Sequence, residues 1–198
     1  MSNFRTWLAE KSLEERELFL GKAPRLWLEG RQLNKVCRLL TDFDFIEAKI
    51  NHPKFGVQAL IEDYDLIDDT EFLTHLEYDA QTVKALKLIQ GALRLSVHIL
   101  NEDKTQLAGQ LSGRLLYFNA PEIQRLLQQI PQTKTTCLRT LAASLTPPGG
   151  ALVRTLSGHS DWVNAVAVTP DSKYVISGSR DSTLKVWDLH SGEVKFTL

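Results

Sequence analysis

Cysteine is scarce in this sequence: only two of its 198 residues, Cys37 and Cys137, are cysteines. They lie far apart, and neither has a second thiol or a histidine at the spacing of a metal site. Isolated cysteines of this kind are typical of reduced intracellular thiols that pack as small hydrophobic side chains. We expect this state for both cysteines, and a disulfide or a metal site is the alternative.

Long apolar runs are also missing. No window approaches the roughly 18 consecutive apolar residues that a membrane-spanning helix needs. The amino-terminal run MSNFRTWLAEKSLEERELFL carries charge throughout and lacks the apolar core of a signal peptide. We therefore expect a cytoplasmic protein with no integral membrane segment.

An excess of one charge sign is absent. The chain has 23 lysines and arginines against 24 aspartates and glutamates, so its formal net charge is -1. The basic residues are dispersed rather than clustered, and the aromatic residues stand at core spacing. The sequence therefore favours no nucleic-acid partner.

Catalytic motifs are absent as well. The nearest candidate for a P-loop is Gly21-Lys22, but Arg16 stands where the motif needs its first glycine. Ala23 stands where the motif needs a serine or threonine to hold magnesium. The G-x-S-x-G motif of serine hydrolases does not occur. We expect no bound cofactor and no enzyme activity.

Residues 55 to 72 form the most acidic part of the chain. They hold six carboxylates and no lysine or arginine: Glu62, Asp63, Asp65, Asp68, Asp69 and Glu71. A calcium loop needs oxygen ligands at alternate positions and a glycine at the sixth, and Ile67 and Asp68 break that pattern. The pattern predicts a solvated helix end and loop, and an acidic face for a partner is the alternative.

Residues 1 to 145 are rich in helix signals. Ser12 and Glu15 have the spacing of a capping box, which predicts a short helix that Gly21 ends. Pro24 fits the first turn of the next segment, since its missing N–H is of little consequence there. Thr41 or Asp42 can cap a further short helix.

The segment from residue 81 to 101 predicts the longest helix. Its apolar residues form two adjacent stripes at helical spacing, and the polar residues, which include Gln90 and His98, form one narrow stripe. We therefore expect His98 to be a surface histidine. A helix with two apolar stripes is typical of the middle of a stacked helical array.

The carboxyl-terminal part changes from helical to β patterning. The run TPPGG at 146–150 combines stiff prolines with glycines that permit a turn. Three β-type runs follow at 163–170, 174–181 and 184–188, with turn signals between them. The runs together resemble a WD40 repeat. The resemblance implies that EVKFTL at 193–198 is the outer strand of this blade and that ALVRTL at 151–156 is an outer strand that belongs to the preceding blade.

Gly158-His159 and Trp187-Asp188 frame these runs, and the segment from about 152 to 198 resembles one WD40 repeat, the four-stranded blade of a β-propeller. The resemblance implies a structural relay of hydrogen bonds among four side chains, namely His159, Ser177, Asp181 and Trp187. A serine, a histidine and an aspartate together also suggest a hydrolase. A nucleophilic serine needs exposure and an oxyanion hole, whereas Ser177 is expected inside an inner strand, so the relay is favoured.

The helical part resembles the helical domain of Apaf-1-type proteins found in bacterial, especially cyanobacterial, WD40 proteins. The resemblance is carried by the order of APRLWLEGRQLNKVCRLLTDFDFIEAKI, the acidic segment, LKLIQGALRLSVHIL and QLAGQLSGRLL. The predicted fold is therefore α and β in separate domains, with an all-α helical array followed by a single four-stranded antiparallel blade. We expect a helical domain at 1–145, a Pro/Gly linker at 146–151 and one repeat at 152–198.

A propeller needs about four to eight blades, so one repeat cannot close a ring. We expect either the front part of a longer propeller protein or several copies that pool their blades. The leading functional hypothesis is a non-catalytic scaffold that binds protein partners, with possible self-association through exposed blade faces. The alternative, implied by the Apaf-1 resemblance, is a regulatory fragment of an NB-ARC type, ATP-dependent signalling switch whose nucleotide-binding module lies elsewhere.

Overall fold

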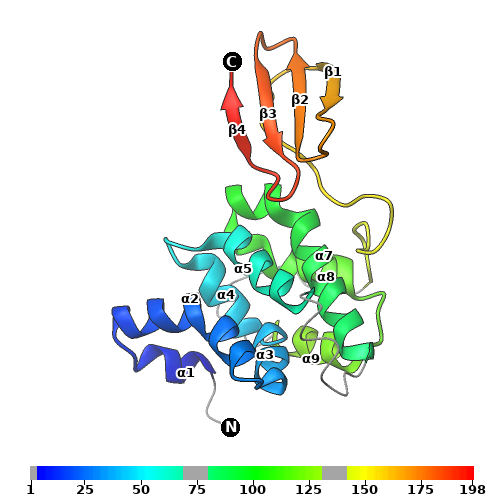
Figure 1. The fold of residues 1–198 in the computed structure, drawn as a ribbon. Helices are drawn as coiled ribbons and strands as arrows, with labels where there is room; N and C mark the ends of the chain where they lie inside the picture. The colour runs from blue at the N-terminus through cyan, green and yellow to red at the C-terminus, as the bar shows by residue number, and fades with distance from the viewer. Residues whose placement is uncertain (1–3, 69–79, 131–141) are drawn as a thin grey trace. The chain divides into compact units, whose positions relative to one another are not determined.

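The computed structural model of the chain describes residues 4–68, 80–130 and 142–198 (Figure 1). Its internal contacts divide the chain into a helical unit, Met1–Val153, and a sheet unit, Arg154–Leu198. Helices come first and a four-stranded antiparallel sheet comes last, so the predicted fold class is confirmed. Within the described part of the chain, no helix combines the length and the apolar character needed to cross a membrane.

The helical unit packs around α7 (Ala80–Glu102), which contacts α3, α5, α8 and α9. The other α-helices are α1 (Phe4–Ala9), α2 (Leu13–Glu29), α3 (Leu33–Leu40), α4 (Phe43–Asn51), α5 (Gly56–Asp65), α8 (Leu107–Leu115) and α9 (Pro121–Gln129). Two short 3-10 helices, η1 (Leu66–Asp68) and η2 (Lys104–Gln106), follow α5 and α7. One apolar core runs through the unit and includes Leu40, Phe45, Ile61, Ile89, Leu93 and Leu111.

Helix α2 begins as predicted and ends later than predicted. The Ser12 hydroxyl accepts a hydrogen bond from the Glu15 backbone N–H, and the Glu15 carboxylate accepts one from the Ser12 N–H, which completes the capping box. The helix then continues through Gly21 and Pro24, so the predicted end at Gly21 is wrong. The physical reason is tertiary packing: α2 buries Leu20, Ala23, Pro24 and Leu28, and this burial outweighs the low helix propensity of glycine and proline.

Gly21 has a packing role inside α2. A Cβ atom at this position would lie 2.9 Å from Cζ of Phe55. The absence of a side chain therefore lets the Phe55 ring approach the helix backbone. The glycine that looks like a helix end in the sequence is a point of close contact in the structure.

Helix α7 buries both predicted apolar stripes and also part of the predicted polar stripe. Gln90 is only 6% exposed and donates hydrogen bonds to the Ile61 carbonyl at 3.2 Å and the Asp65 carboxylate at 2.7 Å. The prediction that Gln90 lies on a solvent-exposed polar stripe is therefore wrong. His98 is half-buried, and its Nδ1 atom is buried without a hydrogen-bond partner, so it is not an ordinary surface histidine.

A buried ion pair joins α4 to α5. The Lys49 side chain is 2% exposed, and its Nζ lies 2.5 Å from Oδ2 of Asp63. Asp63 belongs to the acidic segment that was predicted to be solvated, and that prediction is wrong for this residue. Burial raises the pKa of the Asp63 carboxyl to about 6, although Lys49 acts in the opposite direction.

Residues 144–148 pack on the helical unit rather than forming a free connection. The N–H groups of Ser144 and Leu145 both donate to the carbonyl of Gly113 at 3.1 Å. Arg114, whose pKa is lowered by burial, donates to the carbonyl of Thr146 at 2.9 Å. Gly91 leaves room for the Pro148 ring, which a Cβ would meet at 2.8 Å. The domain ranges 1–145, 146–151 and 152–198 stay a prediction.

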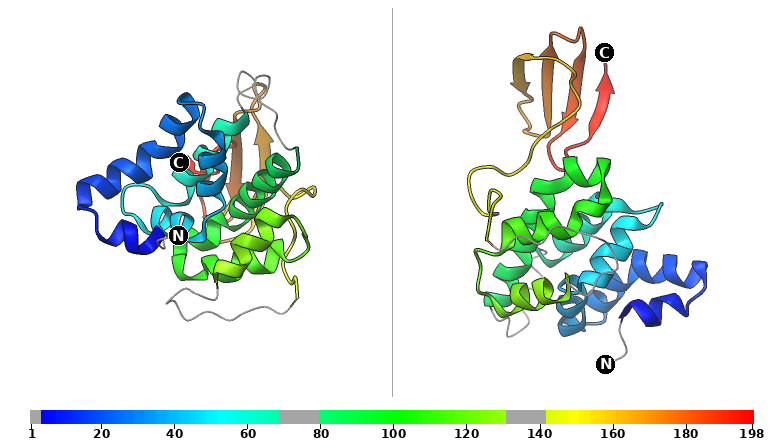
Figure 2. Two further views of the ribbon diagram at one scale, coloured as in Figure 1. Left: turned by 90° about the horizontal axis from the view of Figure 1, so that it is seen from below. Right: turned by 180° about the vertical axis from the view of Figure 1, so that it is seen from behind.

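The sheet unit contains β1 (Val163–Val168), β2 (Tyr174–Ser179), β3 (Leu184–Asp188) and β4 (Val194–Thr197), hydrogen-bonded in that order. Figure 2 shows the four strands from two further sides. Residues 151–156, predicted to be a strand, form none. A strand needs a hydrogen-bonding neighbour, and the described residues offer none to this segment.

The buried ion pair generates a stability prediction. Replacing Lys49 by methionine leaves the Asp63 carboxylate buried without a cation, which destabilises the helical unit by about 3 kcal/mol at pH 8. The folded-state pKa of Asp63 lies above its ordinary value of 3.8, so protonation below about pH 6 favours the folded state and shrinks the loss. Urea unfolding, followed by the helical circular dichroism signal at both pH values, measures this.

The matched control is Arg25→Met, which removes an exposed ion pair with Glu29 and is expected to change stability by less than about 0.5 kcal/mol. The double variant K49M/D63L is expected to regain most of the lost stability. A K49M variant whose loss is the same at pH 5 and pH 8 would contradict the account.

Candidate functional site

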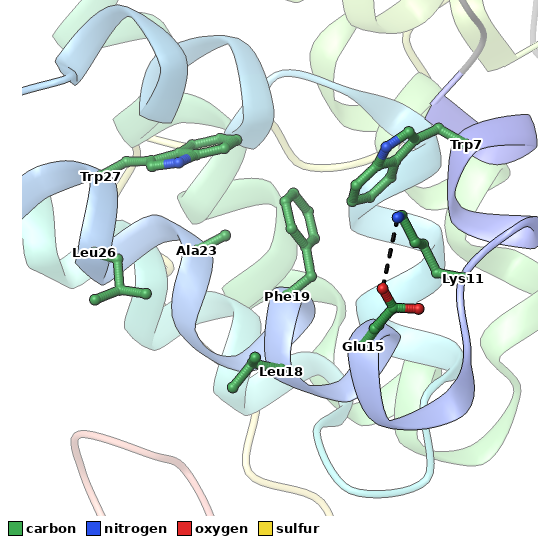
Figure 3. Close-up of a pocket in the computed structure, with 8 residues that line it drawn as sticks. All are labelled: Trp7, Lys11, Glu15, Leu18, Phe19, Ala23, Leu26 and Trp27. Atoms are coloured by element: carbon green, nitrogen blue, oxygen red, sulfur yellow. Dashed lines mark ion pairs between the residues drawn. The ribbon is translucent and has the colours of Figure 1, made fainter.

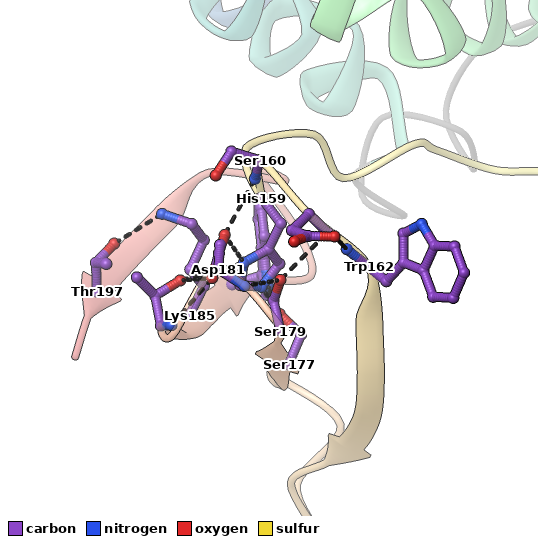
Figure 4. Close-up of polar contacts among 11 residues, drawn as sticks. His159, Ser160, Trp162, Ser177, Ser179, Asp181, Lys185 and Thr197 are labelled. Carbon is purple, nitrogen blue, oxygen red and sulfur yellow. Dashed lines mark hydrogen bonds and ion pairs between the residues drawn. The ribbon is translucent and has the colours of Figure 1, made fainter.

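The sheet unit brings together all four side chains that the sequence singled out. The Trp187 indole Nε1–H donates to Oγ of Ser177 at 2.7 Å, and Nε2 of His159 lies 2.7 Å from the same oxygen. Nδ1 of His159 lies 2.9 Å from Oδ2 of Asp181 (Figure 4). The residues come from β3, β2, the segment before β1, and the turn between β2 and β3. We refer to this chain of hydrogen bonds as the relay.

Asp181 fixes the direction of the relay. Its pKa is held well below the usual range, chiefly by the hydrogen bond from the Thr183 hydroxyl and also by those from His159 and the Ser160 N–H. An ionised carboxylate only accepts hydrogen bonds, so His159 must carry its proton on Nδ1. In the neutral imidazole Nε2 then accepts from the Ser177 hydroxyl, whose oxygen accepts from Trp187. Each polar atom of the relay has a partner.

The relay is closed to solvent. Ser177 is 5% exposed and Trp187 is 2% exposed, and the side chains of His159 and Asp181 are 5% and 6% exposed. The only hydroxyl proton of Ser177 is committed to His159, and no open space adjoins the oxygen for a substrate. This geometry fits a structural link between the segment before β1 and the β2–β3 turn. It fits a nucleophilic role for Ser177 less well.

The repeat signature consists of Gly158, His159, Trp187 and Asp188, which lie in the relay or next to it. Gly158 has a φ of +154°, and a Cβ there would lie 3.2 Å from Cη2 of Trp187. Asp188 accepts hydrogen bonds from the N–H groups of His190 and Ser191, both at 2.9 Å, and so holds the turn that follows β3. His159 and Trp187 lie in the relay itself. Within the described residues, no group of three or more histidine, cysteine or acidic side chains could hold a metal ion.

Three further residues support the relay and were missed in the sequence. Thr183 donates from Oγ1 to Oδ1 of Asp181 at 2.6 Å, and the Ser160 N–H donates to Oδ2 at 3.0 Å. Ser179 accepts from the Asp181 N–H and donates to the Asp161 carbonyl, both at 3.1 Å. The Asp-x-Thr spacing at 181–183 is the pattern of an Asx turn and could have indicated Thr183. Nothing in the sequence pattern indicates Ser160.

The two faces of the sheet differ in how they are covered. On one face Val175 and Trp187 are 8% and 2% exposed, and Gly158 and His159 lie against the Trp187 ring. The opposite face, here the bare face, carries residues that pair across the strands and point to the same side: Ala167, Ile176, Leu184, Val186 and Phe196. Its exposed fractions reach 39% at Ile176, 47% at Leu184 and 65% at Phe196.

Strand β1 is exposed at all six residues. Its sequence is apolar at nearly every position, which predicts a strand covered on both faces. Among the described residues nothing supplies that cover. Val166 pairs with Ser177 and Val168 pairs with Val175, so both lie on the same face as Trp187. They are 63% and 57% exposed, so the β1 edge of that face is uncovered as well.

Comparison with known proteins identifies the sheet unit. A family model described as "WD domain, G-beta repeat" matches residues 150–188. The chain therefore contains a WD40 repeat, and its four-stranded sheet matches a single blade. No solved structure matches the chain.

The curated relatives are proteins with WD repeats. The chain is 35% identical to mouse Pleiotropic regulator 1 over 83 residues, which are 39% of this chain and 16% of the relative. It is 44% identical to Schizosaccharomyces pombe Pre-mRNA-splicing factor prp5 over 132 residues, 63% of this chain and 28% of the relative. Mouse NACHT domain- and WD repeat-containing protein 1 is 29% identical over 153 residues, 72% of this chain and 9% of the relative. The chain spans less than a third of the length of each.

The relay generates a prediction for Ser177→Ala. This change removes the partner of the Trp187 indole N–H and of His159 Nε2 inside a buried site, and unpaired buried polar groups cost about 1 to 3 kcal/mol each. The sheet unit is expected to lose about 2 to 4 kcal/mol of stability. Hydrogen exchange of the Trp187 indole proton, followed by NMR, is expected to become much faster.

The control for this experiment is Ser177→Thr, which keeps the hydroxyl and adds one methyl group. The account requires that the threonine variant keep the slow exchange of the Trp187 indole proton. Equal exchange in the alanine and threonine variants would show that the hydroxyl does not hold the relay.

Asp181 generates a prediction about acid. A carboxyl whose folded-state pKa lies below its ordinary value of 3.8 stabilises the fold above that value, and the contribution is lost as the pH falls further. The amide NMR signals of β2 and β3 are therefore expected to lose their dispersion below about pH 4. Asp181→Asn is expected to weaken the sheet unit at pH 7 and to flatten this acid transition. An unchanged transition in the variant would contradict the assignment.

Proposed function

We propose that the chain is a non-catalytic protein-interaction scaffold and that its sheet unit is the first blade of a longer WD40 propeller. The observation that carries the proposal is the bare face. Large exposed apolar patches mark interaction sites, and Ile176, Leu184 and Phe196 form such a patch on one side of the sheet. In a propeller a neighbouring blade covers this face.

The size of the sheet unit supports the same proposal. Arg154–Leu198 is a short segment, and a core of that size rarely supplies more than about 3 to 5 kcal/mol. Full burial of an isoleucine, leucine or phenylalanine side chain contributes about 1.5 to 3 kcal/mol. Three such side chains on the bare face therefore represent a stabilisation comparable with the whole stability of the unit. A partner surface on this face would decide whether the blade is folded.

The relatives support a scaffold among proteins. Those matched are named as a pleiotropic regulator, a splicing factor and a protein that combines a NACHT domain with WD repeats. We propose protein partners for this chain and no nucleic-acid partner, since its basic residues are dispersed and its net charge is -1. We also propose a cytoplasmic location, which the scarcity of cysteine supports.

A second candidate function is a regulatory fragment of an ATP-dependent switch. The match to NACHT domain- and WD repeat-containing protein 1 covers 72% of this chain, which is more than residues 150–198 can hold, so it extends into the helical unit. This favours the Apaf-1-like interpretation of that unit, with a bacterial origin as part of the same proposal. Gly21 and Lys22 lie in the middle of α2, where no loop can surround a phosphate, so a nucleotide module would have to act from outside these residues.

The scaffold proposal predicts self-association of the chain. With the bare face uncovered, the protein is expected to form dimers or larger species in light scattering at micromolar concentration. Ile176→Lys and Phe196→Glu place charges on that face and are expected to shift the chain toward monomer. The control Lys173→Glu changes an exposed residue in the β1–β2 turn and is expected to leave association unchanged. A monodisperse wild-type monomer with a cooperatively melting sheet would contradict the proposal.

A further inference from the structure

The helical unit carries an apolar groove that the fold does not use. The groove has a volume of about 310 Å³ and lies between α1 and α2 (Figure 3). Phe19 and Ala23 line its middle, and Trp7 and Trp27 stand at its two ends. Leu18 and Leu26 form one rim and are 58% and 56% exposed. Figures 1 and 2 show α1 and α2 side by side.

The aromatic residues hold one another in place. The rings of Trp7 and Phe19 meet edge to face with centroids 4.8 Å apart, and those of Phe19 and Trp27 do so at 5.7 Å. Edge-to-face pairs of this kind add about 0.5 to 1.5 kcal/mol beyond area burial. The groove is therefore preformed, and a ligand would bind without first ordering its walls.

The charges around the groove exclude a cationic ligand. Nζ of Lys11 lies 5.6 Å from the ring centroid of Trp7, and Nζ of Lys35 lies 5.8 Å from that of Trp27. The chain's own ammonium groups thus already interact with both indoles. An aromatic cage for a quaternary ammonium would need those positions free.

The Trp27 end of the groove is positively charged. A second hollow of about 200 Å³ shares Trp27 with the groove and is also lined by Lys35, Arg38 and Asp42. The Asp42 carboxylate caps α4 by accepting from the N–H groups of Asp44 and Phe45, and burial raises its pKa. Lys35 and Arg38 are exposed. Because the Asp42 carboxylate is already hydrogen-bonded to the backbone of α4, it does not neutralise both side chains, and this end of the groove attracts an anion. At the other end Lys11 is paired with Glu15 at 3.6 Å.

We propose that this groove binds an amphipathic helix of a partner protein, with apolar side chains in the groove and acidic residues beside Lys35 and Arg38. Leu18 and Leu26 are two helical turns apart, about 12 Å along α2. A helix laid along α2 presents apolar residues over the same length at positions i, i+4 and i+7. The exposed leucine rim makes the groove an open trough, whereas small-molecule sites enclose most of their ligand. The inference does not depend on the propeller proposal, since it concerns the helical unit alone.

The test starts from a phage-displayed library of helix-forming peptides of about 15 residues, with apolar and charged positions randomised. The full chain is the target, and the double variant L18E/L26E is the subtraction target, which removes peptides that bind the bare face of the sheet. Enriched peptides are expected to share apolar residues at helical spacing and aspartate or glutamate near one end. Enrichment without acidic residues would overturn the proposed orientation and charge recognition.

Fluorescence titration of one enriched peptide then assigns the groove. Leu18→Glu and Leu26→Glu are each expected to weaken binding about tenfold or more, because a charge enters the apolar contact. Leu13→Glu is the matched control: Leu13 lies on the same helix, is 78% exposed, and does not line the groove. Equal weakening by L13E would contradict the proposal.

Reversing the charges of Lys35 and Arg38 distinguishes a loss of charge recognition from damage to the fold. The double variant K35E/R38E is expected to lose the acidic peptide and to bind the same peptide with lysines in place of its acidic residues. Failure of this exchange, with the helical circular dichroism signal intact, would overturn the role of Lys35 and Arg38. Dimers of the chain that L26E abolishes would instead assign the groove to a second copy and overturn the proposed partner.

Discussion

The described residues cover only part of the apolar surface of the sheet unit, and the proposed scaffold function follows from this constraint. The segment before β1 places Gly158 and His159 against Trp187 and Ser177 and so covers the central part of one face. No described segment protects the bare face, where Phe196 is 65% exposed. Apolar area that is exposed to water makes folding less favourable. A second surface that covers this area removes the unfavourable contribution. The sheet unit thus leaves apolar side chains of the bare face exposed.

The polar relay and the bare face have complementary roles. The relay pairs its own buried polar atoms with one another, and these hydrogen bonds link the loop before β1 to the β2–β3 turn within the same chain. The bare face on the opposite side of the same strands carries the exposed apolar residues Ile176, Leu184 and Phe196. The helical unit differs because its apolar core is enclosed, and its main buried ion pair, Lys49 with Asp63, has a partner within the unit. Its exposed apolar residues include Leu18 and Leu26 at the α1–α2 groove.

The fold class could be predicted from short-range patterns in the sequence, and the relay residues were expected from the resemblance to a WD40 repeat. The capping box at Ser12 and Glu15 and the strand runs before Trp187 are local signals that packing does not reverse. Gly21 was misinterpreted because its role depends on Phe55, which comes from a distant part of the chain. Asp63 was misinterpreted for the same reason, since only the fold places Lys49 beside it. Residues whose meaning depends on a distant neighbour cannot be assigned from spacing alone.

The central claim is that the bare face must be covered for the blade to be stable. Hydrogen–deuterium exchange of the full chain at several protein concentrations tests it directly. The account predicts that α7 is protected equally at every concentration, whereas β1 and β4 gain protection as the concentration rises and copies cover one another. Protection of β1 and β4 that equals that of α7 and does not change with concentration would contradict it.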